Sequence, residues 1–177
     1  MEWAASRGKA PFTSTGENNP SNTTELTQFT AQFAEVEVDT DTGRVQLRRL
    51  ATSQDVGTII NPAAHQGQIE GGLIQALGQA VSEHLVVQDG FVVTAHLGDY
   101  KLPTIKDIPE LTTVNVRAPG SGPFDIKAIS ELTSACLPAA IANAVYDAVG
   151  VRLMELPVSA EAVFRELQRN NREAPNT

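Results

Sequence analysis

The sequence predicts an α+β domain in which a mixed sheet with hairpins packs against helices. Apolar and polar residues alternate in several short stretches, as they do in strands with one buried face. Three other stretches carry apolar residues at helical spacing, and turns rich in glycine, proline, asparagine and aspartate separate the elements. A length of 177 residues fits about one domain, and 41% hydrophobic with 19% charged residues excludes a disordered or collagen-like chain.

The first two strands are expected to form a hairpin. Residues 29–39 alternate, and the turn at 39–43 leads into a second alternating stretch at 44–50. The alternation slips by one position between Phe33 and Val36, and we expect a β-bulge to absorb the slip.

A long helix is expected from Pro62 to about Glu83. Its apolar stripe consists of Ile69, Leu73, Leu77 and Val81. Four glycines lie in the same stretch: Gly67, Gly71, Gly72 and Gly78. Each glycine in a helix interior costs about 1 kcal/mol relative to alanine, so something must come close to the helix backbone. A packed neighbouring element and a bound ligand explain the glycines equally well.

The middle of the chain is expected to hold a second hairpin and a further strand. The hairpin covers residues 86–94 and turns at Asp89-Gly90. The strand covers 112–116, and a loop rich in glycine and proline follows at 119–124.

Two helices are expected to complete the fold. One starts near Pro138 and ends at Gly150, and Ser159 caps the other. The domain is therefore expected at residues 29–167.

The two ends of the chain are expected to lie outside the core. Residues 1–28 are interpreted as a polar extended or mobile segment, and residues 168–177 as a frayed tail. No stretch approaches the roughly 18 apolar residues of a membrane span, and no basic and apolar leader is present. We therefore expect a cytoplasmic protein with no membrane partner.

Charge and metal-ligating residues narrow the function classes. The chain has 13 Lys and Arg against 21 Asp and Glu, a net charge of -8, which disfavours nucleic acid as a partner. The single cysteine, Cys136, cannot supply the thiolates of an iron–sulfur cluster or structural zinc site. The three histidines lack the i, i+4 spacing of a helical zinc pair, so no metal site made of protein ligands is expected.

Three polar residues are candidates for chemistry. Glu131 follows the glycine-rich loop and precedes an apolar helix, so it is either a first-turn carboxylate stabilised by the helix dipole or a general base. Lys127 is expected to pair with Glu131, with an anionic ligand, or in an exposed ion pair. Gln68 lies in the glycine-containing helix, where its amide either offers hydrogen bonds to a polar ligand or belongs to a solvated face.

Five motifs occur together in the sequence. They are DVGTIINP at 55–62, GQIEGGLIQALG at 67–78, DYKLP at 99–103, KAISE at 127–131 and PAAIANAV at 138–145. Their order and spacing, from about residue 29 to residue 167, resemble the C-terminal part of the molybdopterin-binding large subunit of the xanthine dehydrogenase and aldehyde oxidase family of molybdenum hydroxylases. The resemblance implies a C-terminal molybdenum-cofactor-binding subdomain within the α+β fold.

The resemblance also implies an activity and site residues. Members of that family hydroxylate an aldehyde or an N-heterocycle with oxygen drawn from water, at molybdenum held by a pterin. The glutamate that matches Glu131 acts as the general base. The glutamine that matches Gln68 lies beside the cofactor, and the backbone of four further residues passes close to it: Lys127, Ala128, Ile129 and Ser130.

Two residues depart from the family pattern. Ser130 stands where the family usually has glycine, and Leu132 where it usually has proline. The backbone angles of this loop are therefore expected to differ, and a side chain at Ser130 would narrow the pocket or add a hydrogen bond.

The resemblance covers only part of a much longer family subunit. The partners it implies are the remainder of the large subunit, an iron–sulfur subunit and an FAD subunit, and the cofactor is molybdopterin, in its plain or cytosine dinucleotide form. A split subunit, a truncated gene and an excised domain all remain open. Exposed apolar faces are expected, so the isolated chain should associate. The rival hypothesis is a non-catalytic structural remnant or assembly module of such a subunit.

Overall fold

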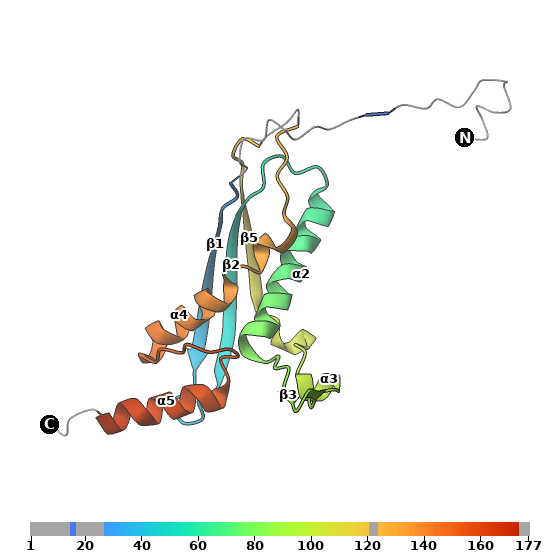
Figure 1. Cartoon of the computed structure of the whole chain (residues 1–177). Helices are drawn as coiled ribbons and strands as arrows, with labels where there is room; N and C mark the ends of the chain where they lie inside the picture. The colour runs from blue at the N-terminus through green and yellow to red at the C-terminus, as the bar shows by residue number, and fades with distance from the viewer. Residues whose placement is uncertain (1–14, 17–26, 121–123, 174–177) are drawn as a thin grey trace.

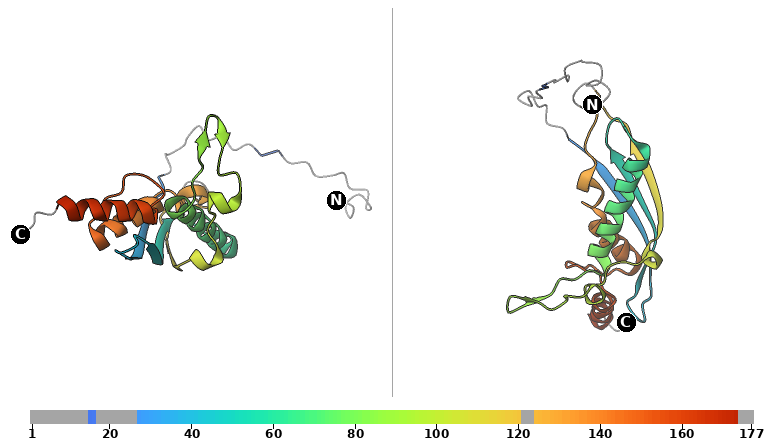
Figure 2. Two further views of the ribbon diagram at one scale, coloured as in Figure 1. Left: turned by 90° about the horizontal axis from the view of Figure 1, so that it is seen from below. Right: turned by 90° about the vertical axis from the view of Figure 1, so that its right-hand side faces the viewer.

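A three-stranded mixed sheet forms the centre of the computed structural model, which describes residues 15–16, 27–120 and 124–173. Strand β1 (Thr30–Val38) is antiparallel to β2 (Val45–Asp55), and β2 is parallel to β5 (Glu110–Val116). Helices α2 (Pro62–Val81) and α4 (Leu137–Val149) cover one face of this sheet (Figures 1 and 2). The predicted α+β fold with a mixed sheet is therefore confirmed.

The first hairpin forms as predicted, but its bulge lies on the other strand. Strand β1 alternates without interruption: Val36 packs on the core, whereas Phe33 lies on the opposite face and is 68% exposed. The register shift leaves Arg48 as the extra residue on β2, so that Arg48 and Arg49 are both exposed. The bulge expected between Phe33 and Val36 is confirmed, since the register shifts between Glu35 and Val36. The slip in alternation along β1 is wrong because it assumed that Phe33 faces the core.

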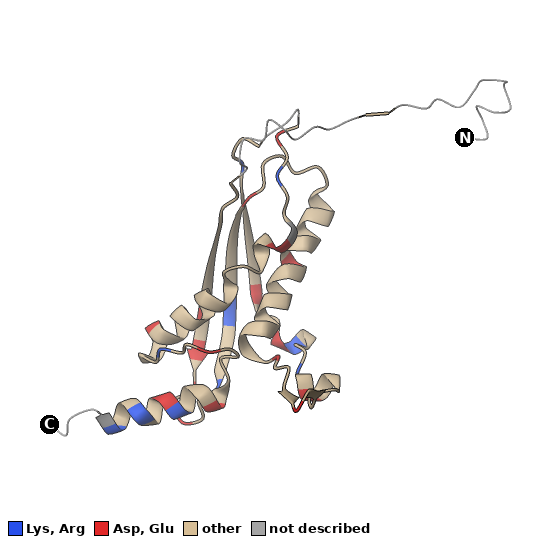
Figure 3. Cartoon of the chain, viewed as in Figure 1, with Lys and Arg blue, Asp and Glu red and all other residues tan. Residues whose placement is uncertain are grey.

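Helix α2 begins and ends close to the predicted positions. The Asn61 side chain caps it by accepting a hydrogen bond from the backbone N–H of Ala64 at 3.1 Å, and Pro62 occupies the first turn. Its buried stripe packs with Leu50 of β2 and Ile141 of α4 in the main hydrophobic core. The helix carries one Asp, Glu, Lys or Arg residue, Glu70 (Figure 3).

The four glycines of α2 have two different explanations. A Cβ at Gly72 would lie 1.8 Å from Thr133 Oγ1, and one at Gly78 would lie 2.9 Å from Pro103 Cδ, so these two glycines admit a packed neighbour. A Cβ at Gly67 or Gly71 would meet nothing within 4 Å. Packing therefore explains Gly72 and Gly78, whereas Gly67 and Gly71 lie on the open surface of the helix.

An arm of short elements connects α2 to β5. It consists of β3 (Val87–Gln88), β4 (Phe91–Val92), α3 (Leu97–Tyr100) and the 3₁₀ helix η2 (Ile105–Asp107). The predicted turn is confirmed, since Asp89 and Gly90 both have positive φ. Figures 1 and 2 show the β3–β4 hairpin projecting from the body of the domain.

The last elements follow η3 (Ser130–Thr133), a second 3₁₀ helix. Helix α4 ends at Gly150, which is left-handed with a φ of 69° as predicted. Ser159 Oγ accepts from the backbone N–H of Ala162 at 3.2 Å and caps α5 (Ala160–Glu173). The frayed tail predicted from residue 168 stays a prediction, although helix α5 extends to Glu173 with Glu and Arg side chains paired along it.

The stretch Glu131–Val149 is more apolar than the sequence analysis expects. With 19 residues and a mean hydropathy of 1.2, it is long and apolar enough to cross a membrane by length and composition alone. In the structure the stretch is not one continuous helix, because a turn and bend separate η3 from the 13 residues of α4. An α-helix of that length spans about 20 Å, less than the roughly 30 Å of a hydrocarbon core. Its buried residues pack in the two hydrophobic cores.

The predicted division of the chain stays a prediction at its N-terminal end. Most of residues 1–28 lie outside the described residues, as do residues 121–123 of the glycine- and proline-rich loop and residues 174–177.

Candidate functional site

An open cleft of about 210 Å³ lies at the N-terminal end of α2. The β2–α2 connection forms one side, including Val56 and Asn61, and residues Ile126, Lys127 and Ile129 contribute another. Gln68 lines the same cleft from the second turn of the helix. The structure thus brings together three of the predicted cofactor-binding residues, Gln68, Lys127 and Ile129, which come from two motifs far apart in the sequence.

Gln68 is exposed, and its polar neighbours on α2 are already engaged. His65 Nε2 lies 2.9 Å from Asn115 Oδ1 on β5, and Gln66 Nε2 donates to Glu70 Oε1 at 2.8 Å. Among the described residues, no hydrogen-bond partner is found for the Gln68 amide. The Gln68 amide can therefore use its two N–H donors and its acceptor oxygen to bind a ligand in the cleft.

The segment before η3 is fastened to the end of β2 by backbone hydrogen bonds. The Lys127 N–H donates to the Val56 carbonyl at 3.0 Å, and the Thr58 N–H donates to the Asp125 carbonyl at 2.8 Å. Gly57 lies between them with a φ of +66°, and a Cβ there would be 2.1 Å from the Asp125 carbonyl oxygen. This approach requires glycine at position 57, both for its left-handed backbone and for space.

Lys127 makes a buried ion pair with Asp55. Lys127 Nζ lies 2.7 Å from Asp55 Oδ2, and the two side chains are only 5% and 7% exposed. The ammonium group also donates to the Thr27 carbonyl at 3.3 Å. The expectations of a pair with Glu131 or an exposed ion pair are therefore wrong, and the charge is held by Asp55 instead of being presented to an anionic ligand.

The next three residues are placed differently. Ala128 is exposed, and its carbonyl accepts from Gln28 Nε2 at 2.6 Å. Ile129 lines the cleft and packs on the main core, and Ser130 is the first residue of η3. Ala128 does not line the described cleft.

Glu131 lies in η3, outside the cleft that contains Gln68. It is exposed, and no hydrogen bond or ion pair of its carboxylate is found among the described residues. The four residues of η3 are too few for a substantial helix dipole, which weakens the first-turn explanation. The burial that favours a carboxylate base is not supplied by the described residues of this chain.

The 3₁₀ helix η3, which carries Glu131, is held in place by contacts with α2 and β1. Thr133 is fully buried against Gly72, and its carbonyl accepts from Gln32 Nε2 at 2.5 Å. The Cys136 thiol donates to Gln32 Oε1 at 3.2 Å, and burial raises the pKa of this thiol. Helix α2 and strand β1 therefore both hold η3 in place.

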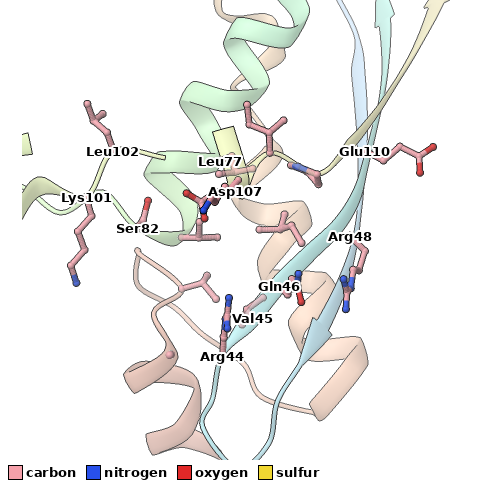
Figure 4. A pocket seen from close by; sticks show the side chains of 17 residues that line it. Arg44, Val45, Gln46, Arg48, Leu77, Ser82, Lys101, Leu102, Asp107 and Glu110 are labelled. Atoms are coloured by element: carbon pink, nitrogen blue, oxygen red, sulfur yellow. The ribbon is translucent and has the colours of Figure 1, made fainter. Parts of the chain in front are cut away.

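A larger cleft of about 590 Å³ lies at the opposite end of α2 (Figure 4). Side chains of both charges line it, including Arg44, Lys101, Asp107 and Glu110. The pKa of Asp107 is lowered, because the Thr104 backbone N–H and hydroxyl donate to its carboxylate. None of the predicted site residues lines this cleft.

The family is decided by a match to a known domain. Residues 3–109 match the family described as "Molybdopterin cofactor-binding domain", which covers more than half of the chain. The chain belongs to the molybdopterin cofactor-binding domain family. The match includes Gln68 and ends before the KAISE motif at 127–131.

Relatives of this molybdopterin cofactor-binding chain are oxidoreductase subunits. It is 34% identical over 143 residues to the aldehyde oxidoreductase molybdenum-binding subunit PaoC of Escherichia coli, covering 78% of this chain and 20% of that one. It is 35% identical over 146 residues to subunit gamma of the 6-hydroxypseudooxynicotine dehydrogenase complex of Paenarthrobacter nicotinovorans, covering 79% and 18%. The chain thus spans about a fifth of the length of the curated relatives it matches.

A solved structure gives the same result. The aldehyde oxidoreductase of Desulfovibrio gigas is 36% identical with a TM-score of 0.73, over 80% of this chain and 15% of that one. The resemblance to molybdenum hydroxylases inferred from the five motifs is therefore confirmed.

The residues of the cleft fit one side of the molybdopterin cofactor. The Gln68 amide, which lines the cleft, is a neutral hydrogen-bonding group with no partner found among the described residues. The cleft is open, which suits a face that contributes part of a larger site. Within the described ranges no group of three or more His, Cys, Asp and Glu side chains is placed to hold a metal ion.

Sequence reasoning missed the residues that hold the cleft together. The sequence predicts no separate role for Asp55 or Gly57, which belong to the motif at 55–62. The available signal was the Asp-Val-Gly sequence at a strand end, where glycine marks a turn or a close backbone approach. The partner of Asp55, 72 residues away at Lys127, carries no local signal.

Proposed function

We propose that this chain is the C-terminal cofactor-binding segment of a molybdenum hydroxylase, which hydroxylates an aldehyde or an N-heterocycle with oxygen derived from water. The observation that carries the proposal is the meeting of Gln68 with Ile126, Lys127 and Ile129 along one cleft, in a chain of the molybdopterin cofactor-binding family. Relatives named for an aldehyde and for an alkaloid support the class of reaction and leave the substrate within it unassigned.

The proposed roles divide between the two motifs. Gln68 would hold the cofactor through its free amide, and Ile129 with the backbone of Lys127 to Ser130 would border it. When bound, the molybdenum cofactor supplies the redox chemistry that the protein side chains lack. Glu131 would act as the general base, and its exposed carboxylate would be covered by protein or cofactor that this chain does not supply.

The partners we propose follow from the length of the relatives. The chain spans about a fifth of each relative, so the remainder of the large subunit would complete the pocket. An iron–sulfur subunit and an FAD subunit would carry electrons away, and the pterin would be plain molybdopterin or its cytosine dinucleotide. The naming of one relative as a subunit of a complex supports a heteromeric assembly, which we place in the cytoplasm.

The first test measures metals in the native assembly. The chain is captured from its own cells under gentle conditions, and molybdenum and iron are determined per chain. We expect both metals in near-stoichiometric amounts. A folded chain that carries neither metal would instead support the rival role, a structural remnant or assembly module.

The second test addresses Glu131. In the assembled enzyme, Glu131→Gln should leave molybdenum content unchanged and lower kcat by a factor of about 100 or more, because general-base catalysis contributes typically 10²–10⁴-fold. Steady-state turnover and molybdenum content are measured side by side, with the exposed and distant Glu155→Gln as control. Near-normal turnover in Glu131→Gln would exclude it as the base.

A further inference from the structure

The buried ion pair between Asp55 and Lys127 lies directly behind the candidate cleft. Asp55 is the last residue of β2 and does not line the cleft, whereas Lys127 does. Their 2.7 Å contact joins the two sides that border the cleft. A carboxylate and an ammonium group are thus both removed from water at the point where two distant motifs meet.

Stability alone is a weak explanation for such a pair. Removing two charges from water offsets much of their mutual attraction, and buried pairs can often be replaced by apolar residues without loss of stability. One oxygen of the carboxylate, Asp55 Oδ1, is buried and has no hydrogen-bond partner among the described residues, so the ion pair leaves one polar atom unsatisfied there. Its geometric effect on the cleft is a better explanation for its presence.

The pair complements the backbone contacts on the same segment. Hydrogen bonds from Lys127 to Val56 and from Thr58 to Asp125 align the segment with the β2–α2 connection. The Lys127 side chain adds a second attachment, to the carboxylate of Asp55 and to the carbonyl of Thr27. The segment is therefore held through both its main chain and a side chain.

We propose that Asp55 is a positioning residue that, through its buried pair with Lys127, fixes the segment 126–129, of which Ile126, Lys127 and Ile129 line the cofactor cleft. The proposal rests on the proposed function, because the wall matters only if a cofactor binds against it. Asp55 touches neither cofactor nor substrate and acts through Lys127.

The test removes both charges at once in the assembled enzyme. In the double variant Asp55→Leu/Lys127→Met no unpaired charge is left in the interior. The matched control is Glu161→Leu/Arg165→Met, which removes an ion pair on α5 whose two side chains are 80% and 71% exposed. For each assembly we measure the unfolding temperature, molybdenum per chain, amide hydrogen exchange at residues 126–129 and the electron paramagnetic resonance spectrum of the reduced metal centre.

A positioning role predicts a local effect. The double variant should assemble and unfold within a few degrees of the wild type, yet hold about tenfold less molybdenum, in the range seen for residues that orient metal-site groups. Hydrogen exchange at residues 126–129 should accelerate, and the spectrum of the remaining metal should change. The control should retain the wild-type values.

Other outcomes overturn the proposal. A double variant that assembles with full molybdenum and an unchanged spectrum would show that the pair does not position the site. One that fails to assemble, while the control assembles, would show that the pair serves the fold. Wild-type chain without molybdenum would overturn the proposed function itself, which separates that failure from the other two.

Discussion

Single residues in α2 distinguish packing from open surface. Gly72 and Gly71 are neighbours in sequence, but a Cβ would collide with the fully buried Thr133 at the first and meet open space at the second. The glycine content of the helix therefore has no single cause. Gly72 lets η3 come close to the helix, and Gly71 leaves bare backbone on the exposed surface of the helix.

This difference predicts opposite effects for two alanine variants of the isolated chain. Gly72→Ala should lower the free energy of unfolding by about 1–3 kcal/mol, because a β-branched, buried neighbour cannot easily move. Gly71→Ala should raise it by up to about 1 kcal/mol through helix propensity. Urea unfolding followed by circular dichroism measures both. Equal effects of the two variants would mean that the contact with Thr133 is not restrictive.

Elements made of local contacts were predictable, and those that depend on distant partners were not. Asp89-Gly90, Ser159 and Gly150 each specify a turn or a helix end by their own chemistry, and all three predictions are confirmed. The parallel pairing of β2 with β5 and the ion pair behind the cleft depend on residues far along the chain, so no pattern within a short window reveals them. Phe33 misled the bulge assignment because an apolar residue was assumed to be buried.

The arm is tied to the end of α2 through Tyr100. Its hydroxyl donates to Glu83 Oε2 at 2.8 Å, and the His84 N–H donates to the Tyr100 carbonyl at 3.3 Å. The carboxylate of Glu83 stabilises the neutral phenol and so raises the pKa of Tyr100 above its usual 10.0. A short hairpin of two-residue strands is marginal by itself, which makes this attachment important for the arm.

The sign of this shift sets the pH range in which the attachment works. Because the folded-state pKa is raised, the stabilisation is fully present below pH 10 and is lost as the pH rises through the folded-state pKa. Glu83→Gln should return the pKa of Tyr100 toward 10, as measured by ultraviolet titration of the phenol, with Glu35→Gln as a remote control. A titration midpoint unaffected by Glu83→Gln would contradict the assignment.

At the scale of the molecule, one face of the sheet has no cover in the described chain. Helices α2 and α4 lie on the other side (Figure 2). The open sheet face consists of the outward residues of the three strands, including Phe33, Val114 and Val116, which are 68%, 53% and 48% exposed. An apolar surface of this kind on a chain that spans a fifth of its relatives is expected to meet another protein surface.

The open sheet face predicts that the isolated chain self-associates. Sedimentation velocity over a range of concentrations should show species larger than the monomer, and Phe33→Asp should shift the population toward monomer. Phe91→Asp, on the exposed β3–β4 hairpin, is the matched comparison. If only Phe91→Asp dissociated the larger species, the self-association surface would lie on the arm and not on the open sheet face.

The separation of 72 residues between Asp55 and Lys127 also bears on the order in which parts of the chain fold. The β1–β2 hairpin and α2 need only nearby residues, so they can form early, whereas β5 and the segment after it must return across a long loop at a higher entropic cost. During synthesis on the ribosome, the β1–β2 hairpin and α2 can therefore form well before the cleft is complete. Cofactor insertion into this segment would follow folding, as a late step in the maturation of the enzyme.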